Sequence, residues 1–270
     1  KALGMQWIPP EMRVDKGEIE AALAGKIPEV VKLSDLRGDL HVHSEWSDGM
    51  NTIEEMVQKA VGLGYEYVAI TDHSHSLKVA KGLTHERVVA KKKEIAVLQK
   101  RYNIRIYMGT ECDILPDGSL DYPEKTLKLF DVVVASVHSL FNQDNTERIL
   151  KAMDNKYVDI IGHPTGRLIS RRDAYLVDLQ AVAKKAAQKG IALEIYSHYE
   201  RMDLHGDAVR QAAALGAHFA INTDAHEKNT LWMMVFGVGI ARRGWLTRQQ
   251  IVNAQGVRWF EQWRTARRKG

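Results

Sequence analysis

The sequence predicts an α/β protein built as a distorted TIM-like barrel of seven strand–helix units. Short apolar runs rich in β-branched residues recur along the chain, which is typical of buried parallel strands. Helical patterns fill the intervals, and strict strand–helix alternation favours a parallel sheet, either open or closed into a barrel. Seven units in roughly 230 residues fit a TIM-type barrel with one unit missing or altered.

The apolar runs give the expected strands in chain order. They are Gly38–His43, Tyr67–His73, Ile104–Asp113, Val132–His138, Val158–His163, Ala192–Tyr196 and Phe219–Asp224. Helices are expected where a capping residue precedes an apolar pattern or a glycine follows its last turn. They are Thr52–Leu63, Thr84–Tyr102, Leu176–Lys189, Asp207–Leu215 and a helix that begins at the capping box of Thr247 and Gln250.

The first 36 residues differ from the rest of the chain. The pair Pro9–Pro10, an acidic stretch and Pro28 indicate a linker and one short helix packed outside the barrel. We therefore expect a linker segment, residues 1–36, followed by one large domain, residues 37–270. The chain begins at Lys1 without a methionine, which indicates a piece of a longer chain.

Composition excludes several classes of protein. Cys112 is the only cysteine, which excludes an internal disulfide framework and favours the cytoplasm. No apolar run reaches the ~18 residues of a membrane span, and no signal peptide is seen, so no membrane contact is expected. The net charge of +4 does not by itself indicate nucleic acid. The basic tail, Arg264–Lys269, is expected to be a solvated helix end.

Histidines and carboxylates gather at the carboxyl ends of the predicted strands. A single histidine there is usually an ordinary polar residue, and an aspartate after a strand is usually a helix cap. Six of the seven strand ends carry these residue types, however, and in a βα barrel those ends converge on one face. Because histidine and carboxylate bind zinc and manganese, a metal centre is predicted at His41, His43, His73, Glu111, His138, His163, Asp224 and His226.

Asp72 and Cys112 are direct neighbours of predicted metal ligands, and other roles are expected for them. Asp72 precedes His73, and it either orients a ligand histidine or caps the following turn. Cys112 follows Glu111 along the strand, so its side chain should point the opposite way and lie in the core.

Longer stretches around these residues show a family pattern. They are RGDLHVHSEWSDG (37–49), YVAITDHS (67–74), GTECDILPDGSLDYP (109–123), DVVVASVHSLFNQD (131–144), VDIIGHPTGRLISRRD (158–173), INTDAH (221–226) and GVGIARRGWL (237–246). Together they resemble the polymerase-and-histidinol-phosphatase (PHP) domain, most closely the version fused to the C-terminus of bacterial family-X DNA polymerases. Residues 7–23 resemble the link into that domain, which implies a family-X polymerase domain upstream as a partner in a longer parent chain.

The resemblance implies a barrel of the PHP type with two to three divalent ions, Mn²⁺ or Zn²⁺, with iron as a third alternative. The first ion would be held by His41, His43, Glu111 and Asp224. Glu111 would bridge to the second ion, which is completed by His138 and His163. The third ion would be held by Asp48, His73 and His226. Asp48 is implied by the resemblance alone, because its Ser-Asp-Gly context reads as a turn.

Such a centre implies hydrolysis of phosphate esters by metal-activated water, with Glu111 and Asp224 as catalytic residues as well as metal ligands. A guanidinium matches phosphate in bidentate fashion, so Arg171 and Arg172, followed by Arg201, are expected to grip the substrate. The family context favours 3′→5′ cleavage at DNA 3′ ends. The alternative is a small-molecule phosphomonoesterase or a promiscuous esterase of aryl phosphate mono-, di- or triesters.

Two rival interpretations belong to other classes. A barrel amidohydrolase shares the first His-x-His and the late aspartate, but it has no need of Asp48, His73 or His226. A non-catalytic PHP module would be expected to lose ligands, and this sequence has kept all nine. One segment, Tyr196–Met202, departs from the family, because bulky residues replace an Asn/Pro stretch. We expect that segment at the mouth of the site, where it affects which substrate is accepted.

Overall fold

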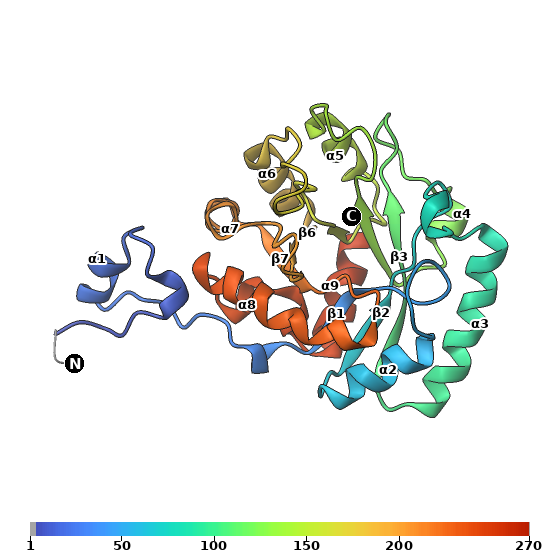
Figure 1. The fold of residues 1–270 in the computed structure, drawn as a ribbon, viewed down its shortest axis with the longest axis horizontal. Helices are drawn as coiled ribbons and strands as arrows, with labels where there is room; N and C mark the ends of the chain where they lie inside the picture. Colours follow the sequence, from blue (N-terminus) through green and yellow to red (C-terminus); the bar gives the residue numbers. More distant parts are fainter. Residues whose placement is uncertain (1–3, 270) are drawn as a thin grey trace.

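A computed structural model of the protein describes residues 4–269, in which seven parallel strands form one sheet (Figure 1). The strands neighbour one another in chain order: β1 (Gly38–Val42), β2 (Tyr67–Ile70), β3 (Arg105–Asp113), β4 (Val132–Ser136), β5 (Ile160–Ile161), β6 (Ala192–Tyr196) and β7 (His218–Asn222). Val42 of β1 forms a parallel bridge with Ala225, just beyond β7, so the sheet nearly closes on itself. This confirms the predicted distorted barrel of seven strands.

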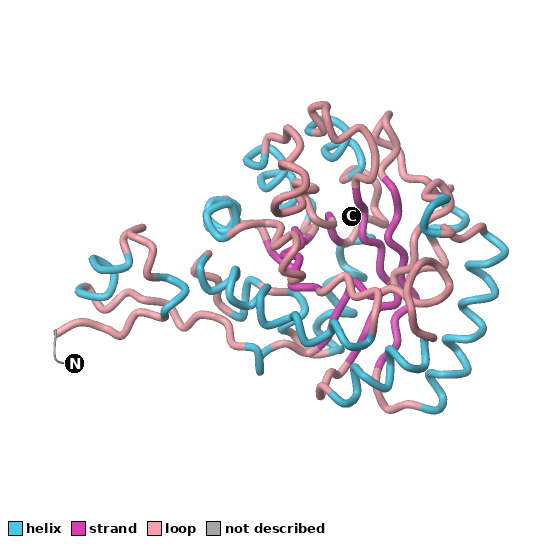
Figure 2. The backbone as a smooth tube through the Cα atoms, viewed as in Figure 1, coloured by secondary structure: helices cyan, strands magenta, loops and turns pink. Residues whose placement is uncertain are grey.

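Helices surround the sheet on its outer side (Figure 2). They are α2 (Ile53–Gly62), α3 (His85–Arg101), α4 (Glu124–Leu127), α5 (Thr146–Ala152), α6 (Leu179–Lys189), α7 (Gly206–Ala214), α8 (Met234–Arg243) and α9 (Val257–Lys269). The predicted caps act as expected at the start of α2 and α3. The Thr52 side chain accepts a hydrogen bond from Glu55 N at 3.2 Å, and Thr84 Oγ1 accepts one from Arg87 N at 3.4 Å.

The prediction of a helix from Thr247 was wrong in length. Thr247 and Gln250 do form a capping box, but they begin only a 3₁₀ turn, Arg248–Gln250. The helices near the end of the chain are α8, whose glycines obscure its helical pattern, and α9, which begins at Val257.

The last helix, α9, closes the amino-terminal end of the barrel. Phe260 is fully buried and stacks on Tyr67 at 5.4 Å between ring centroids. The basic tail is therefore not a solvated helix end, as the sequence suggested. Arg267 and Arg268 both pair with the buried carboxylate of Asp159, and that partner could not be foreseen because it lies more than a hundred positions away.

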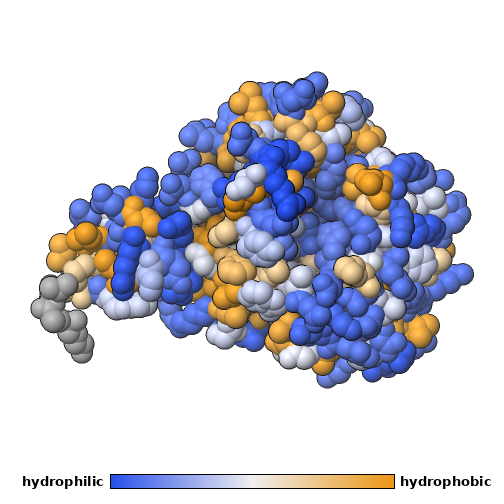
Figure 3. All heavy atoms as spheres, in the orientation of Figure 1, coloured by the Kyte–Doolittle hydropathy of each residue, from blue (hydrophilic) through white to orange (hydrophobic). Residues whose placement is uncertain are grey.

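The described residues before β1 contain one short α-helix, α1 (Glu18–Leu23), and this segment lies to one side of the barrel (Figure 1 and Figure 3). This segment contacts the barrel through α8, where Arg242 pairs with Glu11 at 3.0 Å. Val31 N donates to Leu246 O at 2.9 Å just after that helix. Within residues 4–269, no helix has both the length and the apolar character that a membrane crossing requires.

Candidate metal centre

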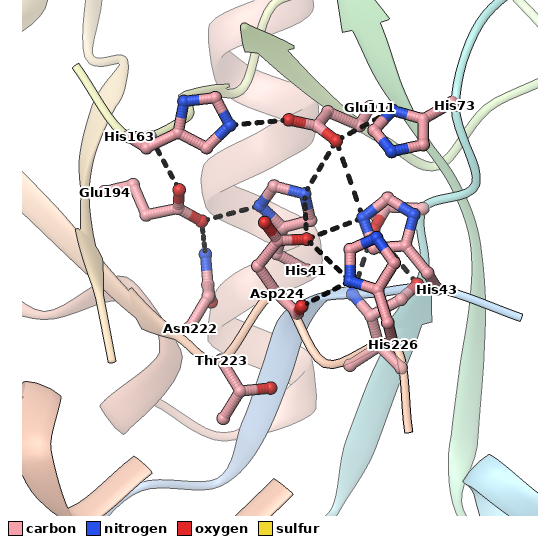
Figure 4. Close-up of polar contacts among 12 residues, drawn as sticks. His41, His43, His73, Glu111, His163, Glu194, Asn222, Thr223, Asp224 and His226 are labelled. Carbon is pink, nitrogen blue, oxygen red and sulfur yellow. Dashed lines mark hydrogen bonds and ion pairs between the residues drawn. The ribbon is translucent and has the colours of Figure 1, made fainter. Parts of the chain in front are cut away.

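The carboxyl ends of the strands converge, and the predicted ligands meet there (Figure 4). His41 lies on β1, Glu111 on β3 and Asp48 in the loop after β1, while the others lie in the first few residues beyond their strands. Three overlapping groups have donor atoms within 4.8 Å of one another. They are His41, His43, Glu111 and Asp224; His43, Asp48, His73 and His226; and His73, Glu111 and His138.

Glu111 lies at the centre of these groups, and its two oxygens face different partners. Oε2 lies 3.0 Å from His73 Nδ1 and 3.4 Å from His41 Nε2. Oε1 lies 2.9 Å from His163 Nε2 and 3.2 Å from His138 Nε2. The carboxylate is fully buried. A single side chain with donors on both sides has the geometry of a bridging ligand.

Several donor atoms of the cluster are buried without a hydrogen-bond partner. They include His41 Nε2, His43 Nε2, His73 Nδ1 and Asp224 Oδ1. Buried polar atoms without partners are rare because each costs about 1–3 kcal/mol. These atoms lie close to one another, as in His43 Nε2 and Asp224 Oδ1 at 2.7 Å. The donor set therefore fits a group of divalent cations, which would satisfy these atoms together.

The electrostatics of the cluster suit cation binding. Burial opposes the charge of Glu111, but the surrounding histidines, His138 first, hold the pKa of that carboxyl well below its usual range. Burial, aided by His226, lowers the pKa of His43 to about 4. Against the effect of burial, Glu111 raises the pKa of His138 to about 10. Metal ligands must be deprotonated, so a cation at His138 would displace a proton.

Asp48 reaches the cluster from the loop after β1. Its Oδ1 lies 3.3 Å from His226 Nε2 and 3.6 Å from His73 Nε2. The loop turns tightly here, because a Cβ on Gly49 would lie only 2.7 Å from the backbone of Ser44. The structure thus brings this loop residue, which sequence pattern alone did not suggest, to the same place as the strand-end ligands.

Asp72 holds that loop rather than a histidine. Its carboxylate accepts hydrogen bonds from Ser44 N at 2.7 Å and from Ser47 Oγ at 2.8 Å. On its other side it pairs with Lys91 Nζ of α3 at 2.7 Å, and both side chains are fully buried. Asp72 therefore caps a loop, as one of the two sequence-based interpretations held, but the capped loop follows β1 and not Asp72 itself. Cys112 is buried in the core, as expected.

The three predicted arginines lie in different places. Arg201 lies over the Tyr196 ring at 5.2 Å and lines a cavity of about 340 Å³ together with Asp224 and His226. Arg172 does not line that cavity, because its guanidinium donates to Gly166 O and lies 3.7 Å from the centre of the Phe141 ring.

Arg171 points to solvent, with a side chain 68% exposed, and it pairs with Glu200 at 3.3 Å. Of the three arginines, only Arg201 therefore lines the cavity beside the donor cluster, so the order expected from the sequence is reversed.

The sequence matches the PHP domain family over residues 39–200. The chain belongs to the PHP family. It is 44% identical over 259 residues to "DNA polymerase/3'-5' exonuclease PolX" of Bacillus subtilis (strain 168), covering 94% of this chain and 45% of that protein. The PHP chain thus spans less than half the length of this relative.

Two further relatives are more distant. A "Probable phosphatase" of Acetivibrio thermocellus is 31% identical over 167 residues, covering 59% of this chain and 65% of that protein. The zinc-bound histidinol phosphate phosphatase of Lactococcus lactis, solved with L-histidinol and phosphate, has a TM-score of 0.55 at 18% identity. That likeness covers 76% of this chain and 93% of the other, and it shows the same fold.

Family and donor cluster together make this PHP chain a metal-dependent phosphoric ester hydrolase. The amidohydrolase interpretation is accordingly replaced by the PHP family. Sequence reasoning missed Glu194 and Lys91, which are fully buried beside the cluster. In the sequence, the only sign of Glu194 was a charged residue within an apolar run, and the only sign of Lys91 was a charged residue on the apolar side of a helix.

Proposed function

We propose that this PHP domain removes nucleotides from DNA 3′ ends by phosphodiester hydrolysis, as a 3′→5′ exonuclease. The observation that carries the proposal is Glu111, whose two oxygens join the donor groups beside a cavity lined by Arg201. The choice of DNA is supported by the PolX relative, which is named a polymerase and 3'-5' exonuclease. The same relative, which is more than twice as long as the matched stretch, supports a family-X polymerase domain upstream in the parent chain. A cytoplasmic place for both rests only on the low cysteine content of the sequence.

In this proposal the nine donors hold two to three divalent ions, Mn²⁺ or Zn²⁺, with iron as a third alternative. The inner ion is held by His41, His43, Glu111 and Asp224, which form one of the three donor groups. The second ion is held by Glu111, His138 and His163, since both imidazoles face Glu111 Oε1. The outer ion is held by Asp48, His73 and His226, which share a donor group with His43. Bound divalent ions would activate a water molecule and offset the charge of the phosphate.

Residues that line the cavity would bind the phosphate of the substrate. Arg201 presents its guanidinium on the side of Asp224 and His226, and stacking on Tyr196 limits its motion. We propose that it binds the scissile phosphate, with Arg172 adding positive charge from the neighbouring loop and Arg171 acting only at the surface. A cavity of about 340 Å³ is near the lower end of ligand-site volumes, which suits one terminal nucleotide.

A second candidate is a phosphatase of small aryl esters, and one observation favours it. His198 lines the cavity and stacks on Tyr199, with ring centroids 4.5 Å apart. Tyr199 is 53% exposed, so this pair of rings is open to solvent on the side of Tyr199. An aryl leaving group could stack on these rings.

One experiment separates these candidates. The full chain, loaded with Mn²⁺ or Zn²⁺, is assayed side by side on a DNA oligonucleotide with a free 3′ end and on p-nitrophenyl phosphate. We expect stepwise release of nucleotides, loss of activity with a chelator, and loss of both activities in Glu111→Gln. Glu29→Gln, which alters an exposed carboxylate, is the matched control. Cleavage of the aryl ester alone would favour the second candidate, and cleavage of neither would contradict both.

A further inference from the structure

Glu194 is a carboxylate beneath the donor cluster that none of the proposed roles includes. It lies on β6, within an apolar strand, and is fully buried. Burying a carboxylate is costly unless donors surround it. Three donors surround Glu194: the imidazole of His41, the amide of Asn222 and the backbone N–H of His163, with no lysine or arginine among them.

The three donors come from three different elements (Figure 4). Oε1 accepts from His41 Nδ1 of β1 at 2.8 Å and from Asn222 Nδ2 of β7 at 2.9 Å. Oε2 accepts from the backbone N–H of His163, just beyond β5, at 2.7 Å. One carboxylate therefore links the strands that carry the inner ligand His41, the ligand His163 and, two residues beyond Asn222, the ligand Asp224.

This contact decides which ring nitrogen of His41 carries the proton. An ionised carboxylate only accepts hydrogen bonds, so Nδ1 must be the donor. In the neutral ring, the lone pair then belongs to Nε2, which lies on the opposite side, 3.3 Å from Asp224 Oδ1 and 3.4 Å from Glu111 Oε2, and would be available to a cation there. The amide of Asn222 is fixed in the same way, because its Oδ1 accepts from Leu40 N at 3.1 Å.

We propose that Glu194 is a positioning residue: it fixes the tautomer and ring orientation of His41, and it holds the ends of β5 and β7, which precede the ligands His163 and Asp224, beside β1. The inference rests on the proposed metal centre, and its test measures metal affinity rather than DNA cleavage. Carboxylates behind metal-binding histidines typically contribute a factor of roughly 10–100 to metal affinity.

Glu194→Gln is the informative substitution because it keeps the size of the side chain. An amide has one acceptor oxygen, so at least one of the three donors would face its NH₂ group. We expect Zn²⁺ binding to the full chain, measured by competition with a chromogenic chelator, to weaken roughly 10–100-fold at the tightest site. Glu194→Asp should recover part of the loss.

The matched control is Asp159→Asn, which alters an equally buried carboxylate at the opposite end of the barrel. It should lower the melting temperature and leave Zn²⁺ affinity within about threefold of wild type, well under the range for a ligand's partner. Equal losses of affinity in both variants would overturn the inference, and so would unchanged affinity in Glu194→Gln. Failure of the wild-type chain to bind Zn²⁺ would instead overturn the proposed function.

A measurement on the wild-type chain needs no variant of Glu194. In ¹⁵N-labelled, zinc-loaded protein, imidazole ¹⁵N spectra report which ring nitrogen bears the proton, with His41→Gln as the assignment control. We expect His41 to carry its proton on Nδ1. A proton on Nε2 would overturn the inference even if Glu194→Gln fails to fold.

Discussion

The buried ion pair between Lys91 and Asp72 gives the sharpest prediction about stability. Lys91→Met keeps the length of the side chain and removes its charge. Nζ lies 2.7 Å from Asp72 Oδ2, and the two side chains are fully inaccessible. Removing one partner of a buried pair leaves an uncompensated charge, which costs about 3–5 kcal/mol.

Two features of the site adjust that figure. Asp72 keeps its hydrogen bonds from Ser44 N and Ser47 Oγ, at 2.7 and 2.8 Å, and these stabilise the remaining charge. Lys91 also donates to the carbonyl oxygen of Ile70 at 2.8 Å, and methionine cannot replace that donor. The two effects oppose each other, so the free energy of unfolding should fall by about 3 kcal/mol, the lower end of the range.

Urea unfolding of the metal-free chain measures this loss directly. Lys92→Met, one position along the same helix and exposed, is the control and should stay within about 0.5 kcal/mol of wild type. Adding Asp72→Asn to Lys91→Met removes the stranded charge and should recover at least about 1 kcal/mol, since the two residues are coupled. A loss below about 1 kcal/mol in Lys91→Met, or no recovery in the double variant, would refute the reasoning.

Three further predictions concern ligands, acid stability and substrate. Glu111→Gln should remove more metal, by elemental analysis, than His226→Ala, because Glu111 contacts both halves of the cluster; equal losses would contradict a bridging role. Hydrogen bonding to Lys228 lowers the pKa of Glu55 to about 2, so stability from this pair should be complete above about pH 4.3 and be lost as pH falls toward 2. Glu55→Gln should flatten that limb of an acid titration, and an unchanged limb would exclude the contact. Replacing residues 196–199 by an Asn/Pro-type sequence should change the ratio of DNA to aryl phosphate rates at least about tenfold; parallel changes would make the segment structural.

Much of the fold and of the donor cluster followed from local pattern. Each expected strand is present, because apolar runs at strand length report burial on both faces of a parallel sheet. The spacing of His41 and His43 predicted that both rings lie on one side of the strand, and their ring centroids are 5.2 Å apart. These properties depend only on neighbouring positions, which a single sequence records.

Long-range partners could not be predicted in the same way. Asp48 lies in a turn that any loop could contain, and only family resemblance pointed to it. In the sequence, Glu194 and Lys91 are isolated charged residues. His41, the partner of Glu194, lies 153 positions away, and Ile70, whose carbonyl oxygen accepts from Lys91, lies 21 positions away. The pairing of Glu194 with His41 is a property of the closed barrel, in which β1 and β7 meet, and the pairing of Lys91 depends on how α3 packs on β2.

The donors of the cluster differ in their exposure to solvent, and this has a kinetic consequence. His41 and His43 are fully enclosed, whereas the side chains of Asp48 and His226 are 34% and 36% exposed. An ion held by the exposed pair would exchange with the medium faster than one held by the enclosed pair, because fewer protein groups must move to release it. The outer ion would then follow changes in metal supply quickly, and the inner ion would respond more slowly.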